Sequence, residues 1–274
     1  MTDDAYLNRF SGIGRLYGVV GLEKFRHAHV AVVGIGGVGC WAAECLARSG
    51  IGKLTLIDAD DLCVTNTNRQ IHALDGTYGK PKVGVMAHRL RAIQPEIEVT
   101  ERHEFLSDRN VDEFLDAGFD AVIDAIDAVR AKCVLLAKCR ERHVPVIACG
   151  GAGGRRDPSQ IRVTDLARTR DDALMMAVRK RLRDEHGFPK ARAGEKIRKF
   201  KIEAVYSEEA PLFPTCDGGV SHERPEDLPG GLRCDAGYGT ATHITAVFGM
   251  IAAGRVLEML IHEGQQDQRG PATK

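Results

Sequence analysis

The sequence lacks the cysteine arrangements that mark common zinc and redox sites. Its 274 residues include eight cysteines, and no two of them form a C-x-x-C pair. This absence argues against a zinc site built from paired cysteines and against a thioredoxin-like motif. Most of the cysteines have apolar neighbours, so we interpret them as small core residues of a protein in a reducing compartment.

An apolar leader of the kind that directs export is also lacking. The chain begins Met-Thr-Asp-Asp, which is acidic, and we therefore expect a cytoplasmic protein. Residues 238–260 form one long apolar segment, for which a membrane span is the alternative to a core helix. His243 and Arg255 interrupt this segment, so we predict a helix buried in the core or at a dimer interface, without stable membrane insertion.

Net charge is zero at pH 7, and aromatic residues make up only 5% of the chain. No overall field attracts a polyanion, so a nucleic-acid site must come from local clustering of charge. Residues 179–201 form such a cluster, with ten Lys or Arg against three acidic residues. By itself this run indicates an ordinary solvated helix and loop. Base stacking would depend on few side chains, with Tyr206, Phe213 and Tyr238 as candidates.

A chain of 274 residues can bury one sizeable core or two modest ones, and its 43% hydrophobic fraction suits an ordinary globular protein. Short apolar runs predict strands at 29–33, 53–57, 97–101, 121–124 and 144–148. Between them, helices are predicted at 38–49, 81–93 and 128–143. This alternation predicts an α/β, Rossmann-like fold, with a mostly parallel sheet and helices on both faces.

The composition changes after residue 150. A glycine-rich loop at 150–154 is followed by a predicted strand at 160–164 and a charged helix at 171–186. Residues 217–234, rich in Gly, Pro and charge, are typical of a long surface loop. We therefore expect a single domain over 1–274, with a Rossmann-like half to about residue 150 and an irregular, substrate-facing C-terminal extension.

The strand at 29–33 leads into a glycine loop, Gly34-Ile-Gly-Gly-Val-Gly39, that opens a helix. Glycines allow a tight turn and a close approach of the backbone, and the helix N-terminus offers free N–H groups to a phosphate. Asp58 ends the second strand, where a carboxylate can accept ribose hydroxyls. We assign nucleotide binding to Gly34, Gly36, Gly37, Gly39 and Asp58. These features alone fit a nicotinamide-dependent dehydrogenase as well as an ATP enzyme.

The stretch that follows favours ATP. Asn66 and Arg69 lie three residues apart, so one helical turn places them on the same face, where both suit phosphate oxygens. Lys82 begins a predicted helix and can meet the same phosphates, whereas a dehydrogenase needs no triphosphate clamp here. Solvated surface roles for Arg69 and Lys82 are the alternative. We assign the ATP site to Asp60, Asn66, Arg69, Gln70 and Lys82.

Asp127 is the candidate metal ligand. It follows the predicted strand at 121–124, and ligands of open α/β sheets bind at the carboxyl ends of strands. Mg²⁺ prefers one or two carboxylates together with phosphate oxygens and water, so we predict that Asp127 holds Mg²⁺. An N-cap for the helix at 128–143 is a second, compatible role.

Together these motifs resemble the ubiquitin-activating-type adenylating enzymes. Within that superfamily the chain resembles the tRNA threonylcarbamoyladenosine dehydratases, from about Arg9 to the C-terminal apolar helix. The segments that carry this second resemblance are 64–73, 124–127, 150–154 and 163–167.

The resemblance implies a ligase-type reaction on tRNA. The free carboxylate of a threonylcarbamoyl group on an anticodon-loop adenosine would attack ATP, releasing pyrophosphate and leaving an acyl-adenylate. A nucleophile within the modification would then close a ring and expel AMP. Arg69, Lys82 and Asp127-bound Mg²⁺ would neutralise the phosphates, and the basic run would contact tRNA, with candidates Arg179, Lys180, Arg181, Arg183, Lys199 and Lys201.

The resemblance also implies a homodimer. Arg9 matches the N-terminal arginine of the superfamily, which reaches the triphosphate of the partner subunit as a further catalytic residue. Two equivalent sites and a dimer-forming role for residues 151–274 follow from this match.

Departures from the superfamily leave alternatives open. The paired zinc cysteines of sulfur-carrier and ubiquitin-type members are absent, and neither Cys216 nor Cys234 lies in a motif that marks a nucleophile. We interpret both cysteines as structural or incidental. The alternatives are an adenylating enzyme for a ubiquitin-like sulfur carrier, an NAD-dependent dehydrogenase, and a non-catalytic scaffold for a cysteine-desulfurase sulfur-transfer system.

Overall fold

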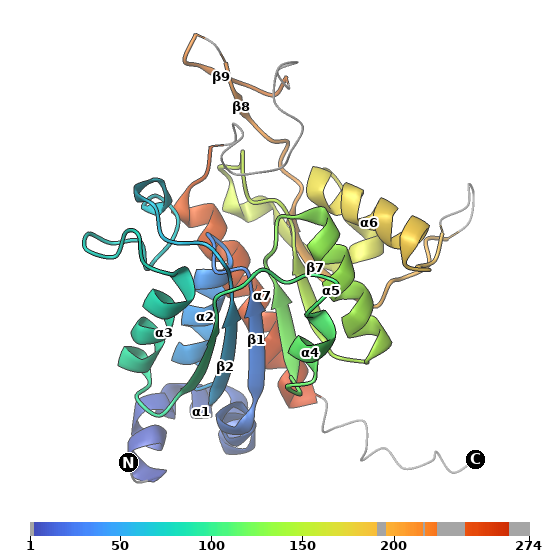
Figure 1. Ribbon diagram of the computed structural model, residues 1–274. Coiled ribbons are helices and arrows are strands. Elements are labelled where there is room, and N and C mark those ends of the chain that lie inside the picture. The colour runs from blue at the N-terminus through green and yellow to red at the C-terminus, as the bar shows by residue number, and fades with distance from the viewer. Residues whose placement is uncertain (1–2, 191–195, 216, 224–238, 263–274) are drawn as a thin grey trace, which may run out of the picture.

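One central sheet with helices on both sides forms the body of the molecule (Figure 1), in a computed structural model that describes residues 3–190, 196–215, 217–223 and 239–262. The strands of the sheet are β1 His29–Val33, β2 Lys53–Ile57, β3 Glu98–Arg102, β4 Ala121–Asp124, β5 Val146–Cys149, β6 Ile161–Asp165 and β7 Glu203–Ser207. Their order is β3-β2-β1-β4-β5-β7-β6. Neighbours are parallel except β6, which is antiparallel to β7. A separate two-stranded ribbon pairs β8 Phe213–Pro214 with β9 Val220–Ser221.

The helices divide into two layers. Their bounds are α1 Asp3–His27, α2 Gly39–Arg48, α3 Lys82–Ile93, α4 Val111–Leu115, α5 Val129–Glu141, α6 Ala173–Glu185 and α7 Thr242–His262, with 3-10 turns η1 Val64–Asn66, η2 Pro158–Gln160 and η3 Leu166–Arg168. Helices α2, α3 and α7 pack on one face of the sheet, and α4, α5 and α6 pack on the other. The predicted α/β fold with a mostly parallel sheet is therefore confirmed.

Strand β1 shows why both faces need a cover. Val30 and Val32 point into the α2–α3–α7 layer, whereas Ala31 and Val33 point into the opposite layer. Side chains alternate along a strand, so a strand that is apolar at every position is buried on both sides. Such a sheet leaves its carboxyl edge as the place for a ligand.

Helix α1 is absent from the sequence-based prediction. Four glycines lower the helix propensity of this segment, and Gly18, at φ 77°, divides the helix at a kink. Tertiary contacts compensate, because Tyr6 and Phe10 are buried and the Tyr6 hydroxyl donates to Gly50 O at 2.6 Å. Packing on the body of the protein therefore holds a helix that local sequence disfavours.

The second half of the chain is less irregular than predicted. It contributes β6 and β7 to the sheet. The sequence analysis did not predict β7, because this short apolar strand directly follows the basic run. Helix α7, with a mean hydropathy of 1.8, is long and apolar enough to cross a membrane. It packs against α2 and over β4 and β5, and Ile244, Phe248 and Val256 are fully buried. Helix α7 is thus a core helix of the sheet.

Candidate nucleotide-binding site

A cavity of about 880 Å³ opens at the carboxyl edge of the sheet, beside the ends of β1, β2, β4 and β5. It gathers most of the predicted ATP and metal residues, which lie on five separate segments of the chain. Those that line it are Gly34, Gly36, Gly37, Asp58, Asp60, Asn66, Arg69, Gln70, Lys82 and Asp127. Gly39 and Arg9 lie elsewhere.

The glycines of the loop have different tasks. A Cβ on Gly34, whose φ is 88°, would lie 2.9 Å from Ala125 O. A Cβ on Gly39 would lie only 1.8 Å from Gly34 O, whereas one on Gly36 meets nothing within 4 Å. Gly39 therefore allows α2 to begin tightly against the loop and does not face the ligand. Gly36 keeps the cavity wall open.

Asp58 is fixed at the end of β2 between two backbone donors. Its Oδ2 accepts from Ile35 N at 2.7 Å and its Oδ1 from Asp60 N at 2.9 Å. Burial raises the pKa of Asp58, and the charge of Lys82, 4.0 Å from Oδ1, opposes that rise. The ribose-binding role of Asp58 stays a prediction, and its position at the end of β2 is compatible with that role.

Lys82 begins α3 with its ammonium at the cavity wall. Its side chain is only 8% exposed, and Nζ lies 2.7 Å from Asp60 Oδ2. Asp60 is half exposed, and its ion pair with Lys82 holds the ammonium among the residues that line the cavity. Asp60 therefore acts on Lys82 in this structure.

Arg69 is held by its backbone from two helices. Trp41 Nε1 on α2 donates to Arg69 O at 3.0 Å, and Thr245 Oγ1 on α7 donates to the same oxygen at 3.4 Å. The guanidinium donates to Thr65 O at 2.7 Å and to Asn68 Oδ1 at 3.1 Å. Both acceptors are neutral, so the positive charge remains available to a phosphate.

Two amides complete this wall. Asn66 uses its Oδ1 to accept from Cys63 N at 2.9 Å, and its amide nitrogen forms no hydrogen bond within the described ranges. Gln70 is 5% exposed, and its buried Oε1 has no partner among the described residues. Buried polar atoms are almost always paired, so an unpaired amide oxygen at a cavity wall indicates a ligand donor.

Asp127 does not cap a helix. Helix α5 begins at Val129 with Ala128 as its N-cap, and the exposed Asp127 carboxylate forms no hydrogen bond or ion pair with any described residue. Nor do the described parts of the chain contain a group of three or more His, Cys, Asp or Glu that could hold a metal. A single free carboxylate at a phosphate cavity fits Mg²⁺, which takes its other ligands from phosphate and water.

Several residues that line the cavity were not assigned to the site in the sequence analysis, among them Phe105, Arg155 and Cys63. Phe105 lies just beyond β3 with 69% of its surface exposed, although it is a large apolar residue. Arg155 also lines the cavity and is 5% exposed. Cys63 is exposed and lines the cavity together with Asn66 and Arg69. Phe105 carried a usable signal, because an apolar residue at the carboxyl end of a predicted strand is a candidate platform for a base.

The predicted tRNA contacts lie outside the cavity, and several of the arginines on α6 have structural partners. Arg179 donates to the carbonyl and hydroxyl oxygens of Thr169, and Arg181 pairs with Glu185 at 2.8 Å. Arg183 lies over the ring of Phe200. The charges of this helix are therefore partly engaged within the protein.

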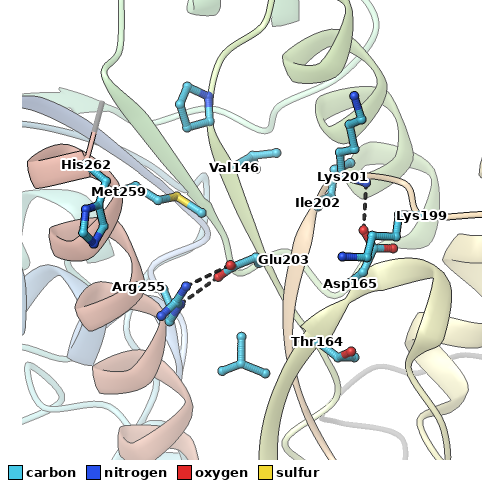
Figure 2. A pocket seen from close by; sticks show the side chains of 12 residues that line it. Val146, Thr164, Asp165, Lys199, Lys201, Ile202, Glu203, Arg255, Met259 and His262 are labelled. Atoms are coloured by element: carbon cyan, nitrogen blue, oxygen red, sulfur yellow. Dashed lines mark hydrogen bonds and ion pairs between the residues drawn. The ribbon is translucent and has the colours of Figure 1, made fainter. Parts of the chain in front are cut away.

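Figure 2 shows the surroundings of Lys199 and Lys201, a second hollow of about 820 Å³ at the amino ends of β5 and β7. Arg255 on α7 crosses it to form a two-pronged pair with Glu203 at 2.8 and 2.9 Å. Lys199 and Lys201 are both exposed. They thus lie at the opposite edge of the sheet from the nucleotide cavity.

Two of the three candidate stacking residues were predicted wrongly. Tyr206 and Phe213 are only 3% and 5% exposed, so neither ring is open to an RNA base. Tyr238, Cys216 and Cys234 lie outside the described residues. Arg9 lies on α1 and donates to Ile93 O at 2.9 Å, away from the cavity of its own chain.

Cys63 offers a direct report on occupancy of the cavity. Hydrogen bonds from the side chain and backbone of Thr65 lower the pKa of its thiol, which favours reaction with an alkylating reagent. A nucleotide bound in the cavity would cover this wall, so ATP at ten times its Kd should slow labelling by N-ethylmaleimide about tenfold. Peptide mass spectrometry follows the labelling, with Cys63→Ser as control. Equal labelling rates with and without MgATP contradict ATP binding here.

His72 makes the fold sensitive to acid. Burial, helped by the charges of Lys82 and Arg89, lowers its pKa to about 4. The unfolded chain binds this proton near pH 6.5 and the folded chain only near pH 4, so stability falls as pH drops through that window, by about 3 kcal/mol in all. Urea unfolding of His72→Leu should lack this loss, whereas His88→Leu, exposed on α3, should retain it. Parallel pH profiles for wild type and His72→Leu count against this origin.

The fold and the cavity define a class. A doubly wound sheet whose glycine loop, acidic strand end and cationic wall meet at the carboxyl edge is a nucleotide-binding α/β protein with a site for a polyphosphate. Residues 11–273 match the model of the ThiF family. The chain belongs to the ThiF family.

Relatives of known activity cover nearly all of the chain. The tRNA threonylcarbamoyladenosine dehydratase of Escherichia coli (strain K12) is 48% identical over 259 residues, which are 94% of this chain and 95% of the relative. The enzyme of the same name from Bacillus subtilis (strain 168) is 35% identical over 257 residues, covering 94% and 96%. The crystal structure of the E. coli dehydratase in complex with ATP gives a TM-score of 0.83 at 44% identity, covering 98% of this chain and 100% of that one.

Proposed function

We propose that this chain catalyses the ATP-dependent dehydration of threonylcarbamoyladenosine in tRNA, by adenylating the threonyl carboxylate. The observation that carries the proposal is the single cavity that unites the glycine loop with Asp58, Arg69, Lys82 and Asp127. Similarity over nearly the whole chain to dehydratases, one of them solved with ATP, supplies the substrate.

ATP would bind with its ribose at Asp58 and its phosphates at the glycine loop. Asp58 accepts from the ribose hydroxyls, and the backbone between Gly34 and Gly37 faces the phosphates at the start of α2. Arg69 and Lys82 lie on the phosphate side of the cavity. Phe105, exposed beyond β3, offers its ring to the adenine.

The reaction proceeds in two steps, adenylation of the carboxylate and ring closure. A carboxylate oxygen of the substrate attacks the α-phosphorus, the bond to the bridging oxygen breaks, and pyrophosphate leaves. A nucleophile of the same modified base then attacks the activated carbonyl, loses its proton, and expels AMP with the former carboxylate oxygen. The nucleoside has lost one water, and ATP has become AMP and pyrophosphate. Because nucleophile and carbonyl belong to one molecule, holding them in contact supplies much of the rate.

Charge stabilisation is the main task of the protein in the first step. Arg69 and Lys82 face the phosphates from two walls and counter the negative charge that moves onto the leaving pyrophosphate. Asp127 would hold Mg²⁺, which would supply positive charge to neutralise the phosphates. The neighbouring Gln70 oxygen, unpaired within the described residues, accepts a donor from the nucleotide.

The same proposal includes a cytoplasmic homodimer. Arg9 points away from its own cavity, which agrees with a role at the site of a partner subunit. Helix α1 also exposes Leu16, Val19 and Val20 to about three quarters of their surface, an apolar face that a second copy would cover. Residues 151–274 would then meet tRNA, with Lys180, Lys199 and Lys201 as its exposed cations.

The experiment that tests the function follows the nucleoside. The protein is incubated with ATP, Mg²⁺ and threonylcarbamoylated tRNA, and the tRNA is digested to nucleosides for mass spectrometry. A product lighter by one water, absent without ATP and strongly reduced with Arg69→Ala, supports the proposal. An unchanged nucleoside rejects it, and pyrophosphate exchange that requires a ubiquitin-fold protein instead would favour the sulfur-carrier alternative.

A further inference from the structure

A fully buried ion pair lies beneath the nucleotide cavity. Lys132 on α5 and Asp124 at the end of β4 are both 0% exposed, and Lys132 Nζ lies 2.9 Å from Asp124 Oδ2. The pair is not among the residues that line the cavity. Neither residue therefore meets the nucleotide, and the function proposed above leaves the pair without a task.

The ammonium of Lys132 also binds the backbone of the turn after β4. It donates to Ile126 O at 2.9 Å and to Asp124 O at 3.3 Å. From the other side, Ile126 N donates to Asp124 Oδ1 at 3.1 Å. Apart from each other, the Lys132 and Asp124 side chains thus contact only the backbone of residues 124–126 among the described residues, and these three residues lead into Asp127.

Residues 124–126 connect the glycine loop, which they contact, with Asp127, which follows them in the chain. Ala125 N donates to Val33 O at 2.8 Å, and Ala125 O lies so near Gly34 that only glycine fits there. Asp127 follows directly, and its carboxylate has no partner of its own among the described residues. The contacts that fix Asp127 against the glycine loop are therefore those made two residues earlier.

Stability alone does not account for the pair. A buried ion pair can often be replaced by uncharged residues of similar volume with little loss, because desolvation offsets the attraction between the charges. A lysine that reaches two carbonyl oxygens does something an apolar residue cannot, since it fixes the path of the backbone. The pair is thus better explained by the geometry of the turn than by its contribution to folding.

We propose that Lys132 is a positioning residue for the metal–phosphate site: its ammonium clamps the carbonyls of Asp124 and Ile126 and so holds the Asp127 carboxylate at the distance from the glycine loop that Mg²⁺-bound ATP requires. The proposal rests on the proposed function, since it takes Asp127 as the Mg²⁺ ligand. It assigns the effect of Lys132 to the binding of MgATP and not to that of ATP alone.

Three variants separate the clamp from the charge. Asp124→Asn removes the carboxylate but leaves Lys132 able to donate to both carbonyls. Lys132→Met removes the clamp, and Asp124→Asn with Lys132→Met removes it without leaving a buried charge behind. The matched control is Asp112→Asn with Lys138→Met, a partly exposed ion pair at 3.3 Å that also involves α5.

Calorimetry of ATP binding, with Mg²⁺ and with EDTA, gives the readout without tRNA or turnover. In wild type, Asp124→Asn and the control pair, Mg²⁺ should strengthen ATP binding equally. In the variants lacking Lys132 that gain should fall about 10- to 100-fold, the usual cost of losing an outer-shell contact, with binding in EDTA unchanged. Either of the two Met-containing variants decides the question, provided that it is folded by circular dichroism.

The outcomes distinguish this proposal from the function itself. A full Mg²⁺ gain in a folded variant without Lys132 overturns the positioning role and leaves the function standing. Equal losses with and without Mg²⁺ also overturn it, because they show a merely structural role. A wild-type protein that binds ATP without any Mg²⁺ gain overturns the metal assignment of Asp127, and the positioning role with it.

Discussion

Replacing Lys82 with methionine is expected to lower the rate of pyrophosphate release about 100- to 1,000-fold, the usual cost of losing one preorganised charge at a reacting group. Lys82 is only 8% exposed, so water cannot take over the role of its ammonium. The fold should survive, because methionine keeps the buried stem and Asp60, half exposed, can be solvated. Affinity for ATP should fall less than the rate, since the charge matters most as pyrophosphate leaves.

The chain supplies a matched control two residues away. Lys80 is exposed and does not line the cavity, so Lys80→Met should leave the rate unchanged. Pyrophosphate release is followed with threonylcarbamoylated tRNA and saturating MgATP for the wild type and both variants. A loss below about fivefold in Lys82→Met, which is the size of a surface-charge effect, would remove Lys82 from the catalytic set.

The second large effect is expected on folding. A methyl group at Gly39 would lie 1.8 Å from Gly34 O, a backbone atom that cannot turn aside. Gly39→Ala should therefore push α2 away from β1 and destabilise the protein by roughly 3 kcal/mol, at the upper end of overpacking costs. Nucleotide binding should weaken with it, because α2 and the loop present the phosphate-binding N–H groups together.

Gly36→Ala is the contrast within the same loop. A methyl group there meets no protein atom within 4 Å but enters the cavity, so the fold should be retained while ATP binds more weakly. Denaturant unfolding and ATP titration of both variants test the division of tasks. If the two variants lose stability equally, the packing role assigned to Gly39 is wrong.

The fold was predictable because its signals are local. Strand β1 and the glycine loop follow each other in sequence, and runs that are apolar at every position indicate a sheet covered on both faces. Helix α1 was not predictable, because its glycines disfavour a helix that the contacts of Tyr6 and Phe10 stabilise from far along the chain. Strand β7 was not predicted either, because its five residues directly follow the basic run and are too few to give a clear apolar pattern.

The sequence predicted which residues form the site better than it predicted what each of them does. The sequence grouped Gly39 with the ligand-facing glycines, and only the distance to Gly34 O shows that it serves packing. It also left open whether Asp127 caps a helix, which depends on where α5 begins. The contacts of Lys132 with the turn after β4 depend on tertiary structure, so no local sequence pattern predicts them.

Helix α7 has a consequence for how the molecule is made. Its first turn is tied to the Arg69 segment, since Thr242 Oγ1 donates to Asn68 O at 2.5 Å and Asn68 Nδ2 to Thr240 O at 2.8 Å. A little further on, Gly249 packs against the start of α2. During synthesis on the ribosome, these contacts can form only after α7 has been made, well after the strands that border the cavity. A chain that ends before α7 would lack the contacts that hold the Arg69 backbone and would expose the apolar sheet face that α7 covers.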